Sequence, residues 1–379
     1  MAVTLRLLPI ERVAAAYCLL TTLLIAVLAS RLVNPAAMLL MRAGWLAATA
    51  LLLAMMHFLS RHSSLFTFHS SFFILLRTTL QLSWLAIWYQ DTYEFNRSFD
   101  NLDHLFAAAD QALFGCQPAI TFSQQLPGAF WSEAFNLGYW SYFPMIALLS
   151  LTTFYTSFIS KNHPSAPAVH GSRSVPHSSL STTDYTDGTD SSFFILHSSF
   201  GAPRHHSSFR AKRDSSFFTF HSSFLTVPPL ILLSFFLFYV IYIFLPVAGP
   251  QYYFQAVGIE EIQAGHFPSL GTYFSSHTEM LPAPGYADGF FYHLVHAAQA
   301  GERPTAAFPS SHIGISTIVL LLARRHAPRL LPVLIPLWAL LCCATVYIQA
   351  HYLVDAIAGL LAAPLILWLA KRLLPVGEK

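Results

Sequence analysis

The chain has 379 residues, of which 55% are hydrophobic and only 10% are charged, and its formal net charge is +2. A soluble globular protein carries roughly 25% charged residues, so this composition excludes an ordinary soluble domain, a disordered chain and a disulfide scaffold. The small net charge does not indicate the basic surface that nucleic-acid binding requires. The composition therefore predicts an all-α polytopic membrane protein.

Apolar runs divide the chain into candidate membrane spans. A helix needs about 20 mostly apolar residues to cross the ~30 Å hydrocarbon layer. Eight runs approach this length, at residues 13–30, 38–59, 72–89, 137–155, 229–247, 310–323, 331–348 and 352–374. The sixth run is short, with a rise of about 21 Å, so its helix is expected to begin in a recess near headgroup depth. The runs predict a bundle of about eight transmembrane helices, the first two within residues 1–60.

Several arginine, tryptophan and tyrosine residues in or near these runs fit structural roles better than functional ones. Arg42 and Arg77 lie inside spans and are expected to snorkel towards polar surface. Other residues fit an interfacial aromatic belt better than a binding site; they are Trp84, Trp88, Trp131, Trp140 and Tyr142.

Basic residues indicate the orientation. Arg324, Arg325 and Arg329 follow the sixth run, and Lys371–Arg372 closes the eighth. The positive-inside rule makes both groups cytoplasmic. The opposite ends of these spans, and the acidic loops 91–136 and 251–308, are then expected outside, with both termini in the cytoplasm.

Residues 161–227 differ from the rest in composition. They are rich in Ser, His and Phe and repeat the phrase His-Ser-Ser-Phe, for example at His197, His206 and His221. The histidine spacing fixes no coordination geometry, so a metal site is the weaker interpretation. The composition predicts a disordered, low-complexity cytoplasmic insertion.

Two short motifs carry ionisable groups at the expected external ends of spans. In His-Tyr-Leu-Val-Asp, His351 precedes Asp355 by four positions, so on a helix the two side chains share a face. A carboxylate that accepts a hydrogen bond from one imidazole nitrogen makes the other nitrogen a better nucleophile or base. The alternative is that the pair has only a structural role and stabilises the helix.

The second motif is Phe-Pro-Ser-Ser-His at 308–312. Ser310 and Ser311 are expected to cap a helix whose first amides can bind phosphate, and His312 could donate a proton to a leaving oxygen. The motif alone could equally be a plain capping turn. Because the topology brings both motifs to one side, together they predict phosphoryl transfer without a metal.

These motifs resemble the second and third signatures of the type 2 phosphatidic acid phosphatase superfamily, most closely its inositolphosphotransferase branch, which includes inositol phosphorylceramide synthases. The resemblance implies a six-helix core, here residues 66–379 interrupted by 161–227. It also implies a metal-independent mechanism with His351 as nucleophile, Asp355 as its partner and His312 as acid. No cofactor is implied.

The chain departs from the superfamily pattern at the basic residues that hold phosphate. Residues 246–250 contain no Lys or Arg, and Ala344 and Thr345 stand where Ser-Arg is usual. The guanidinium is therefore missing or comes from elsewhere. Arg303 is the nearest external candidate, and Arg97 is a more distant one; either could instead be a solvated loop arginine.

Several functions fit these residues. The leading hypothesis is a lipid phosphatase of a bacterial inner membrane that acts on a lipid phosphate or pyrophosphate at the external face. Transfer of a phospho-headgroup to a lipid alcohol is the close alternative. Weaker alternatives are a metal-dependent membrane enzyme or transporter using His312, His351 and Asp355 as ligands, an inactive scaffold, and an intramembrane serine protease using Ser310 or Ser311.

Overall fold

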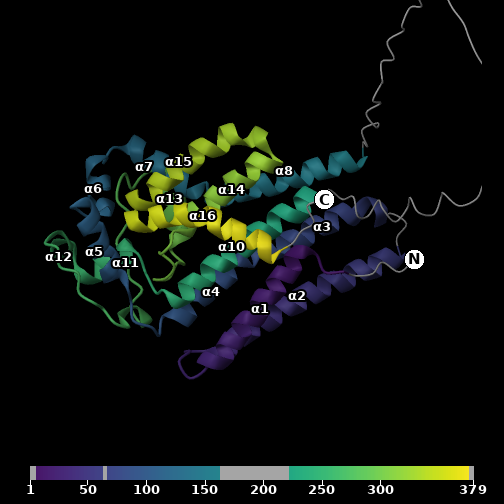
Figure 1. Cartoon of the computed structure of the whole chain (residues 1–379), viewed down its shortest axis with the longest axis horizontal. Helices are drawn as coiled ribbons and strands as arrows, with labels where there is room; N and C mark the ends of the chain where they lie inside the picture. Colours follow the sequence, from purple (N-terminus) through teal and green to yellow (C-terminus); the bar gives the residue numbers. More distant parts are fainter. Residues whose placement is uncertain (1–5, 63–65, 163–221, 375–379) are drawn as a thin grey trace, which may run out of the picture.

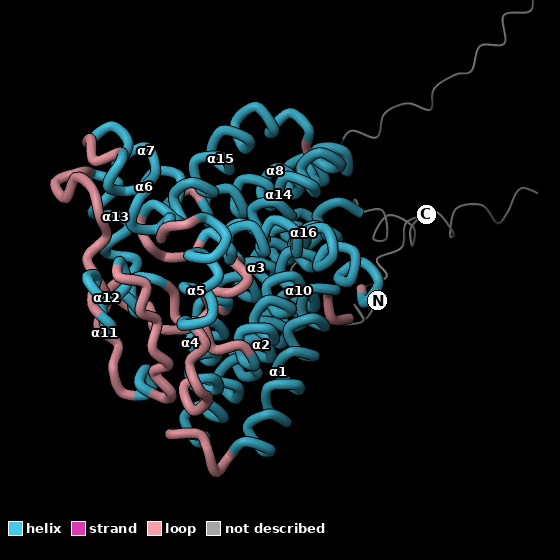
Figure 2. The backbone as a smooth tube through the Cα atoms, turned by 60° about the vertical axis from the view of Figure 1, so that its left-hand side comes forward, coloured by secondary structure: helices cyan, strands magenta, loops and turns pink. Residues whose placement is uncertain are grey.

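The structure is a computed structural model that describes residues 6–62, 66–162 and 222–374. Within these ranges the chain is helical and contains no strand (Figures 1 and 2). The predicted all-α class is confirmed. The α-helices are α1 Pro9–Leu28, α2 Pro35–His62, α3 Phe66–Ser83, α4 Leu85–Asn96, α5 Asp103–Phe114, α6 Pro118–Gln125, α7 Ala129–Trp140, α8 Tyr142–Asn162, α10 Ser222–Phe244, α11 Pro250–Val257, α12 Ile259–Gln263, α13 Phe290–Gln299, α14 Ser311–His326, α15 Leu331–Tyr347 and α16 Leu353–Leu373.

Seven helical segments in the described part of the chain are long and apolar enough to cross a membrane. They are Pro9–Leu28, Pro35–Leu59, Ser71–Asn96, Tyr142–Ile159, Ser223–Phe244, Pro328–Tyr347 and Leu353–Leu373. They correspond to seven of the eight predicted spans. The remaining one is α14, whose 16 residues rise about 24 Å and fall short of the hydrocarbon thickness. The protein is thus an integral membrane helix bundle.

The long helices run between two dissimilar ends (Figures 1 and 2). One end carries the short helices α5, α6, α7, α11, α12 and α13 together with most of the loops, and we refer to it as the loop-rich end. The opposite end holds both chain termini, the end of α8 and the start of α10 (Figure 1). The loops 91–136 and 251–308, which were predicted to share one side, therefore do lie at the same end.

The predicted insertion at 161–227 lies mostly outside the described residues, which exclude 163–221. Its predicted end is too late, because α10 already begins at Ser222 and includes Pro228 and Pro229. The boundary was predicted from composition, yet the apolar side chains of Phe224 and Val227 are buried and extend the packed face of the helix towards its N-terminus.

Buried ion pairs fasten the first two helices to the rest of the bundle. Arg77 of α3 donates two hydrogen bonds to Glu11 of α1, at 2.7 and 2.5 Å. Arg42 of α2 lies 2.9 Å from Asp91 of α4, and both side chains are buried. The expectation that Arg42 and Arg77 snorkel is wrong. A guanidinium at this depth is stabilised by a nearby carboxylate instead.

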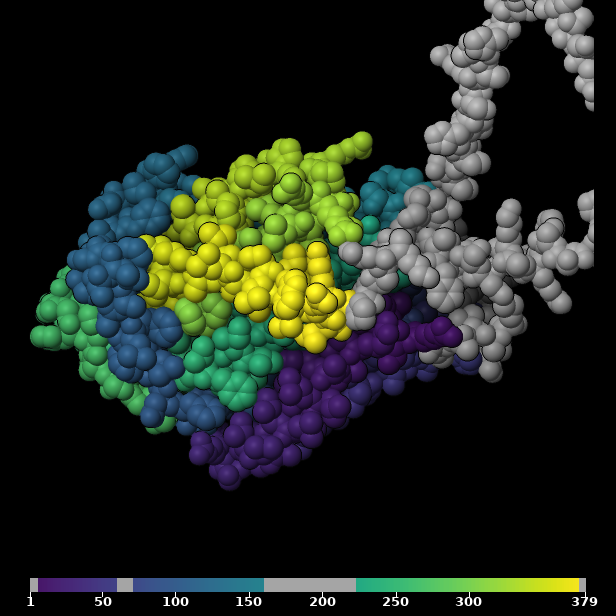
Figure 3. All heavy atoms as spheres, viewed as in Figure 1, coloured from purple at the N-terminus to yellow at the C-terminus, as the bar shows by residue number. Residues whose placement is uncertain are grey.

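Two glycines allow close packing around the start of α14. A β-carbon on Gly359 of α16 would collide with the backbone carbonyl of Ser310, and one on Gly314 would collide with the ring of Phe238 of α10. Helix α16 therefore packs directly against the turn that begins α14. Its opposite face is at the surface (yellow in Figure 3) and exposes Leu361 and Leu365, as expected of a helix face that contacts lipid.

Candidate active site

Two histidines from the two motifs meet at the loop-rich end. His312 lies in the first turn of α14, and His351 lies in the turn between α15 and α16. Nδ1 of His312 is 3.3 Å from Nε2 of His351, although 39 residues separate them in the chain. The structure therefore brings together the two histidines that the sequence singled out.

The backbone fixes the tautomer of His351. Its Nδ1 lies 2.8 Å from the carbonyl oxygen of Ala307. A carbonyl can only accept, so Nδ1 carries the proton and Nε2 keeps its lone pair, directed at His312. Burial lowers the pKa of His351 to about 4, against the opposing effect of the Ala307 hydrogen bond. His351 is thus neutral at ordinary pH.

Asp355 lies close to His351 without a hydrogen bond to it. Its Oδ2 is 3.8 Å from Nδ1 of His351, too far for a hydrogen bond, and accepts the amide of Tyr352 at 3.0 Å. Helix α16 begins only at Leu353, so His351 and Asp355 are not on one continuous helix face. The carbonyl of Ala307 takes the place at Nδ1 that the sequence assigned to this carboxylate.

Ser310 and Ser311 are buried at the start of α14. The hydroxyl of Ser310 accepts the amide of Ile313 at 3.4 Å, and the amide of Ser310 donates to the carbonyl of Asp355 at 3.1 Å. The amide of Ser311 donates to the hydroxyl of Tyr242 at 2.9 Å. These three amides already have acceptors within the protein, so a phosphate at this helix start competes with them.

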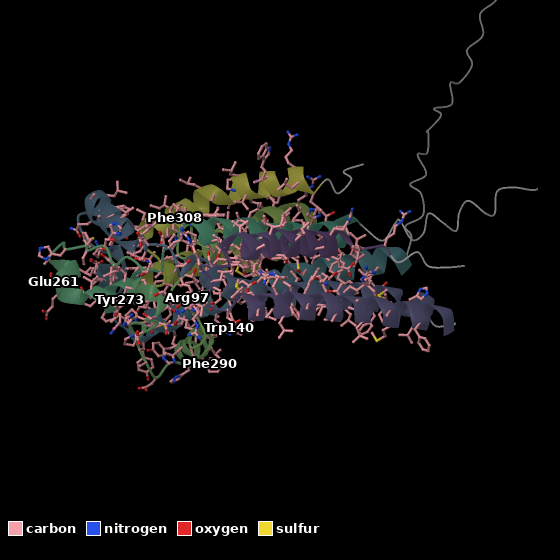
Figure 4. The ribbon with its side chains drawn as sticks, turned by 90° about the horizontal axis from the view of Figure 1, so that it is seen from below. Arg97, Trp140, Glu261, Tyr273, Phe290 and Phe308 are labelled. Carbon is pink, nitrogen blue, oxygen red and sulfur yellow. The ribbon has the colours of Figure 1, made fainter. Side chains whose placement is uncertain are left out.

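Aromatic rings surround His312, a feature that the sequence did not reveal. The ring of Tyr139 stacks on it at 4.7 Å between centroids, and that of Tyr142 lies at 4.6 Å. Tyr142 and Trp88 are buried, so their assignment to an interfacial belt is wrong, whereas Trp140 is partly exposed at the loop-rich end (Figure 4). The phenolic hydroxyl of Tyr142 donates to the carbonyl of Ser311 at 3.3 Å, which ties this aromatic wall to α14.

Helix α5 positions both halves of the site through one carboxylate, Asp103, that the sequence analysis missed. Asp103 is fully buried. It accepts hydrogen bonds from the amides of Ala248 and Gly249 at 2.6 and 2.8 Å, and from the hydroxyl of Tyr352 at 2.9 Å. It therefore links the loop before α11 to the residue that follows His351.

A second carboxylate of α5 caps the helix that follows His351. Asp110 accepts the amides of Leu353 and Val354 at 2.9 and 3.0 Å, the first amides of α16. Burial raises the pKa of Asp110 to about 6, and the two amide hydrogen bonds oppose that rise. Asp103 and Asp110 are seven residues apart, about two helical turns, so both project from the same face of α5. Nothing in the local sequence of α5 indicated these partners.

Arg303 forms no hydrogen bond or ion pair with either histidine in the described part of the chain. It lines a polar pocket together with Arg97, at a position where neither His312 nor His351 contributes. In Figure 4 Arg97 and Phe308 both lie at the loop-rich end. Across the described ranges, no hydrogen bond joins an arginine or lysine to either histidine. The structure thus gathers the two arginines that the sequence raised as phosphate ligands into one place, but apart from the histidine pair.

The described residues hold no group of three or more His, Cys, Asp or Glu side chains arranged to bind a metal ion. His312 and His351 face each other as a pair, and the nearest carboxylate, Asp355, is turned towards the backbone of Tyr352.

No curated protein and no solved structure matches the chain. A family model does match, over the part of the chain that contains both motifs. Residues 216–369, which include His312, His351 and Asp355, match the model of the PAP2 superfamily.

Proposed function

We propose that this protein is a membrane enzyme that hydrolyses a lipid phosphate or pyrophosphate through a phosphohistidine on His351. The observation that carries the proposal is the pair formed by Nε2 of the buried His351 and Nδ1 of the half-buried His312, 3.3 Å apart. One nitrogen has a free lone pair and the other can supply a proton, which are the two groups that displacement at phosphorus requires. The match of residues 216–369 to the PAP2 superfamily supports phosphoester chemistry in general.

In the first step the substrate phosphate enters between the two rings and replaces their hydrogen bond. Nε2 of His351 forms a bond to phosphorus as the bond from phosphorus to the leaving oxygen breaks. The negative charge of the bound phosphate favours protonation of His312 on both ring nitrogens, and this cationic ring gives its Nδ1 proton to that oxygen and becomes neutral. The Ala307 carbonyl holds the Nδ1 proton of His351 throughout and stabilises the positive charge that develops on the ring.

In the second step water attacks phosphorus and gives a proton to His312, and the bond from phosphorus to Nε2 breaks. A lipid alcohol in place of water would give transfer in place of hydrolysis, so the two candidate reactions share the first step. Both return His312 and His351 to their starting protonation.

An apolar groove supports a lipid as the substrate. It has a volume of about 320 Å³ and lies between α6, α14, α15 and α16. Its wall includes Ile313, next to His312, and Leu353 and Ala356, which lie on either side of Asp355 in the chain. A hydrocarbon chain in this groove would end close to the two histidines.

The position of basic residues supports an external site with cytoplasmic termini, in what we propose is a bacterial inner membrane. Helices α14 and α16 both start beside the histidine pair, and both end in basic residues, Arg324 and Arg325 in one and Lys371 and Arg372 in the other. The positive-inside rule puts these basic ends in the cytoplasm.

The test is phosphate release by the detergent-solubilised, full-length protein from a panel of lipid phosphomonoesters and pyrophosphates, with EDTA present and with or without lipid alcohols. Release without an alcohol supports hydrolysis, and a new phospholipid that forms only with an alcohol supports transfer. The proposed function is overturned if no donor gives either phosphate or a new phospholipid although thermal unfolding shows that the protein is folded.

The pH dependence follows from the lowered pKa of His351. Only the neutral ring attacks phosphorus, and burial places its pKa at about 4, below the ordinary value of 6.5. Activity should therefore persist from pH 7 down to about pH 5 and fall only as the pH approaches the lowered pKa. The rate constant kcat/KM measured against pH with a phosphodiester or other substrate that does not ionise in this range checks this, and a midpoint near 6.5 contradicts it.

Because the unfolded chain takes up the proton more readily, stability should also decrease as the pH falls from 6.5 towards 4.

A further inference from the structure

A polar pocket lies at the seam between the first two helices and the rest of the bundle. Its volume is about 340 Å³. It is lined by the start of α2, by the end of α4 and by the loop that follows α13, and these segments contribute Asn34, Asp91, Arg97 and Arg303. Most of this lining lies outside residues 216–369, and no residue of the histidine pair takes part.

Two carboxylates and two guanidinium groups line the pocket, and a third guanidinium, that of Arg42, lies behind Asp91. Asp91 is paired with Arg42 at 2.9 Å, and Glu94 is paired with Arg97 at 3.3 Å. Arg303 is exposed and forms no ion pair with any residue in the described ranges. One guanidinium is thus left over, so the pocket attracts an anion.

The N-terminus of α2 adds to this attraction. Asn34 caps the helix by accepting the amide of Ala37 at 3.0 Å, and both residues line the pocket. The helix has 28 residues, and its N-terminal end carries the positive end of the helix dipole. Arg303 and this helix start therefore present positive potential to the same space.

Asp91 provides a group of the opposite kind. Its side chain is 1% exposed, it lines the pocket, and its Oδ1 accepts no hydrogen bond from the described residues. A buried carboxylate oxygen without a donor calls for a hydroxyl or ammonium group from a ligand. The pocket thus offers a site for an anion next to a site for a hydrogen-bond donor.

We infer that this pocket binds the phosphate group of a hydroxyl-bearing phosphate ester, with Arg303 on the phosphate and Asp91 on the hydroxyl. Val33, Met38 and Met41 form an apolar wall beside these groups. That wall suits a phosphate carried by a lipid whose chain lies along α2, although a free phosphate ester offers the same headgroup chemistry. The inference is independent of the proposed function, because the site uses neither histidine.

The test compares Arg303→Gln with Arg329→Gln, a matched loss of one exposed arginine at the opposite end of the bundle. Both variants are made in the full-length protein carrying His351→Ala, so that no probe is turned over. The probes are phosphatidylglycerol, measured by native mass spectrometry in detergent, and glycerol 3-phosphate and inorganic phosphate, measured by thermal shift. Arg303→Lys, which keeps the charge, serves as a rescue.

Arg303→Gln should bind phosphatidylglycerol about tenfold more weakly than Arg329→Gln, as expected for the loss of one charge-assisted hydrogen bond, and Arg303→Lys should recover most of the loss. The same dependence on Arg303 for glycerol 3-phosphate would identify a soluble phosphate ester as a ligand, and its restriction to phosphatidylglycerol would identify a lipid. Equal binding of every probe by Arg303→Gln and Arg329→Gln overturns the inference. The unfolding temperature checks that Arg303→Gln is folded, which its exposed and unpaired side chain leads us to expect.

Discussion

Replacing His351 with alanine is expected to lower phosphate release by at least about a thousandfold, because the variant lacks the atom that bonds to phosphorus. Neighbouring groups are not expected to substitute for it, since Asp355 is held by the amide of Tyr352 through its Oδ2 and the Nδ1 of His312 is the proton donor of the pair. Initial rates at saturating lipid, with protein quenched in alkaline detergent and assayed for bound phosphate, measure the effect. Wild-type protein should carry an acid-labile phosphoryl group, and the variant should carry none.

The matched control for this substitution is His293→Ala. His293 is an exposed histidine of α13, also at the loop-rich end, and it should retain wild-type activity. Equal rates for His351→Ala and wild type would remove His351 as the nucleophile. If His351→Ala lost activity but still carried a protein-bound phosphoryl group, another residue would be the phosphoryl acceptor.

The second large effect is expected for stability, in Asp103→Ala. The carboxylate of Asp103 accepts hydrogen bonds from the amides of Ala248 and Gly249, from the side-chain amide of Asn101 and from the hydroxyl of Tyr352. Alanine leaves these buried donors without an acceptor, and each unsatisfied buried donor costs about 1–3 kcal/mol. We expect a loss of about 3 kcal/mol or more, measured as a lower unfolding temperature in detergent.

Asp100→Ala is the control, since Asp100 is an exposed acidic residue three positions earlier, in the loop that leads into α5. Its unfolding free energy should change by less than about 0.5 kcal/mol. Tyr352→Phe removes only one of the donors that Asp103 accepts and should fall between the two. An unfolding temperature for Asp103→Ala equal to that of Asp100→Ala would show that this carboxylate does not hold the loop and Tyr352 together.

The membrane bundle could be predicted from the sequence because hydrophobic length is a local property. Each span is a run of consecutive apolar residues, and seven of the eight runs correspond to helices long enough to cross the membrane. The meeting of His312 with His351 could also be anticipated. Two motifs at the same ends of neighbouring spans must lie on one side, whatever the packing details.

The supporting groups could not be predicted, because their partners are distant in sequence. Asp103 bonds to Gly249 and Tyr352, which follow it by 146 and 249 residues. No spacing rule links such positions, and a carboxylate in an acidic loop has the same sequence pattern whether it is solvated or buried. The predicted contact between His351 and Asp355 depended on a helix that begins two residues after His351, so the local backbone redirected both side chains.

The positions at which α8 ends and α10 begins bear on how this gene can change over generations. Tyr142 and Tyr242 contact the turn at Pro309–Ser311, whereas α8 ends at Asn162 and α10 begins at Ser222, each about 20 residues and so about 30 Å further along its helix. Mutations that lengthen, shorten or duplicate the repeats at 163–221 therefore leave the spacing of His312 and His351 unaltered. Selection on catalysis can therefore act on the turn at Pro309–Ser311 independently of changes in chain length between Asn162 and Ser222.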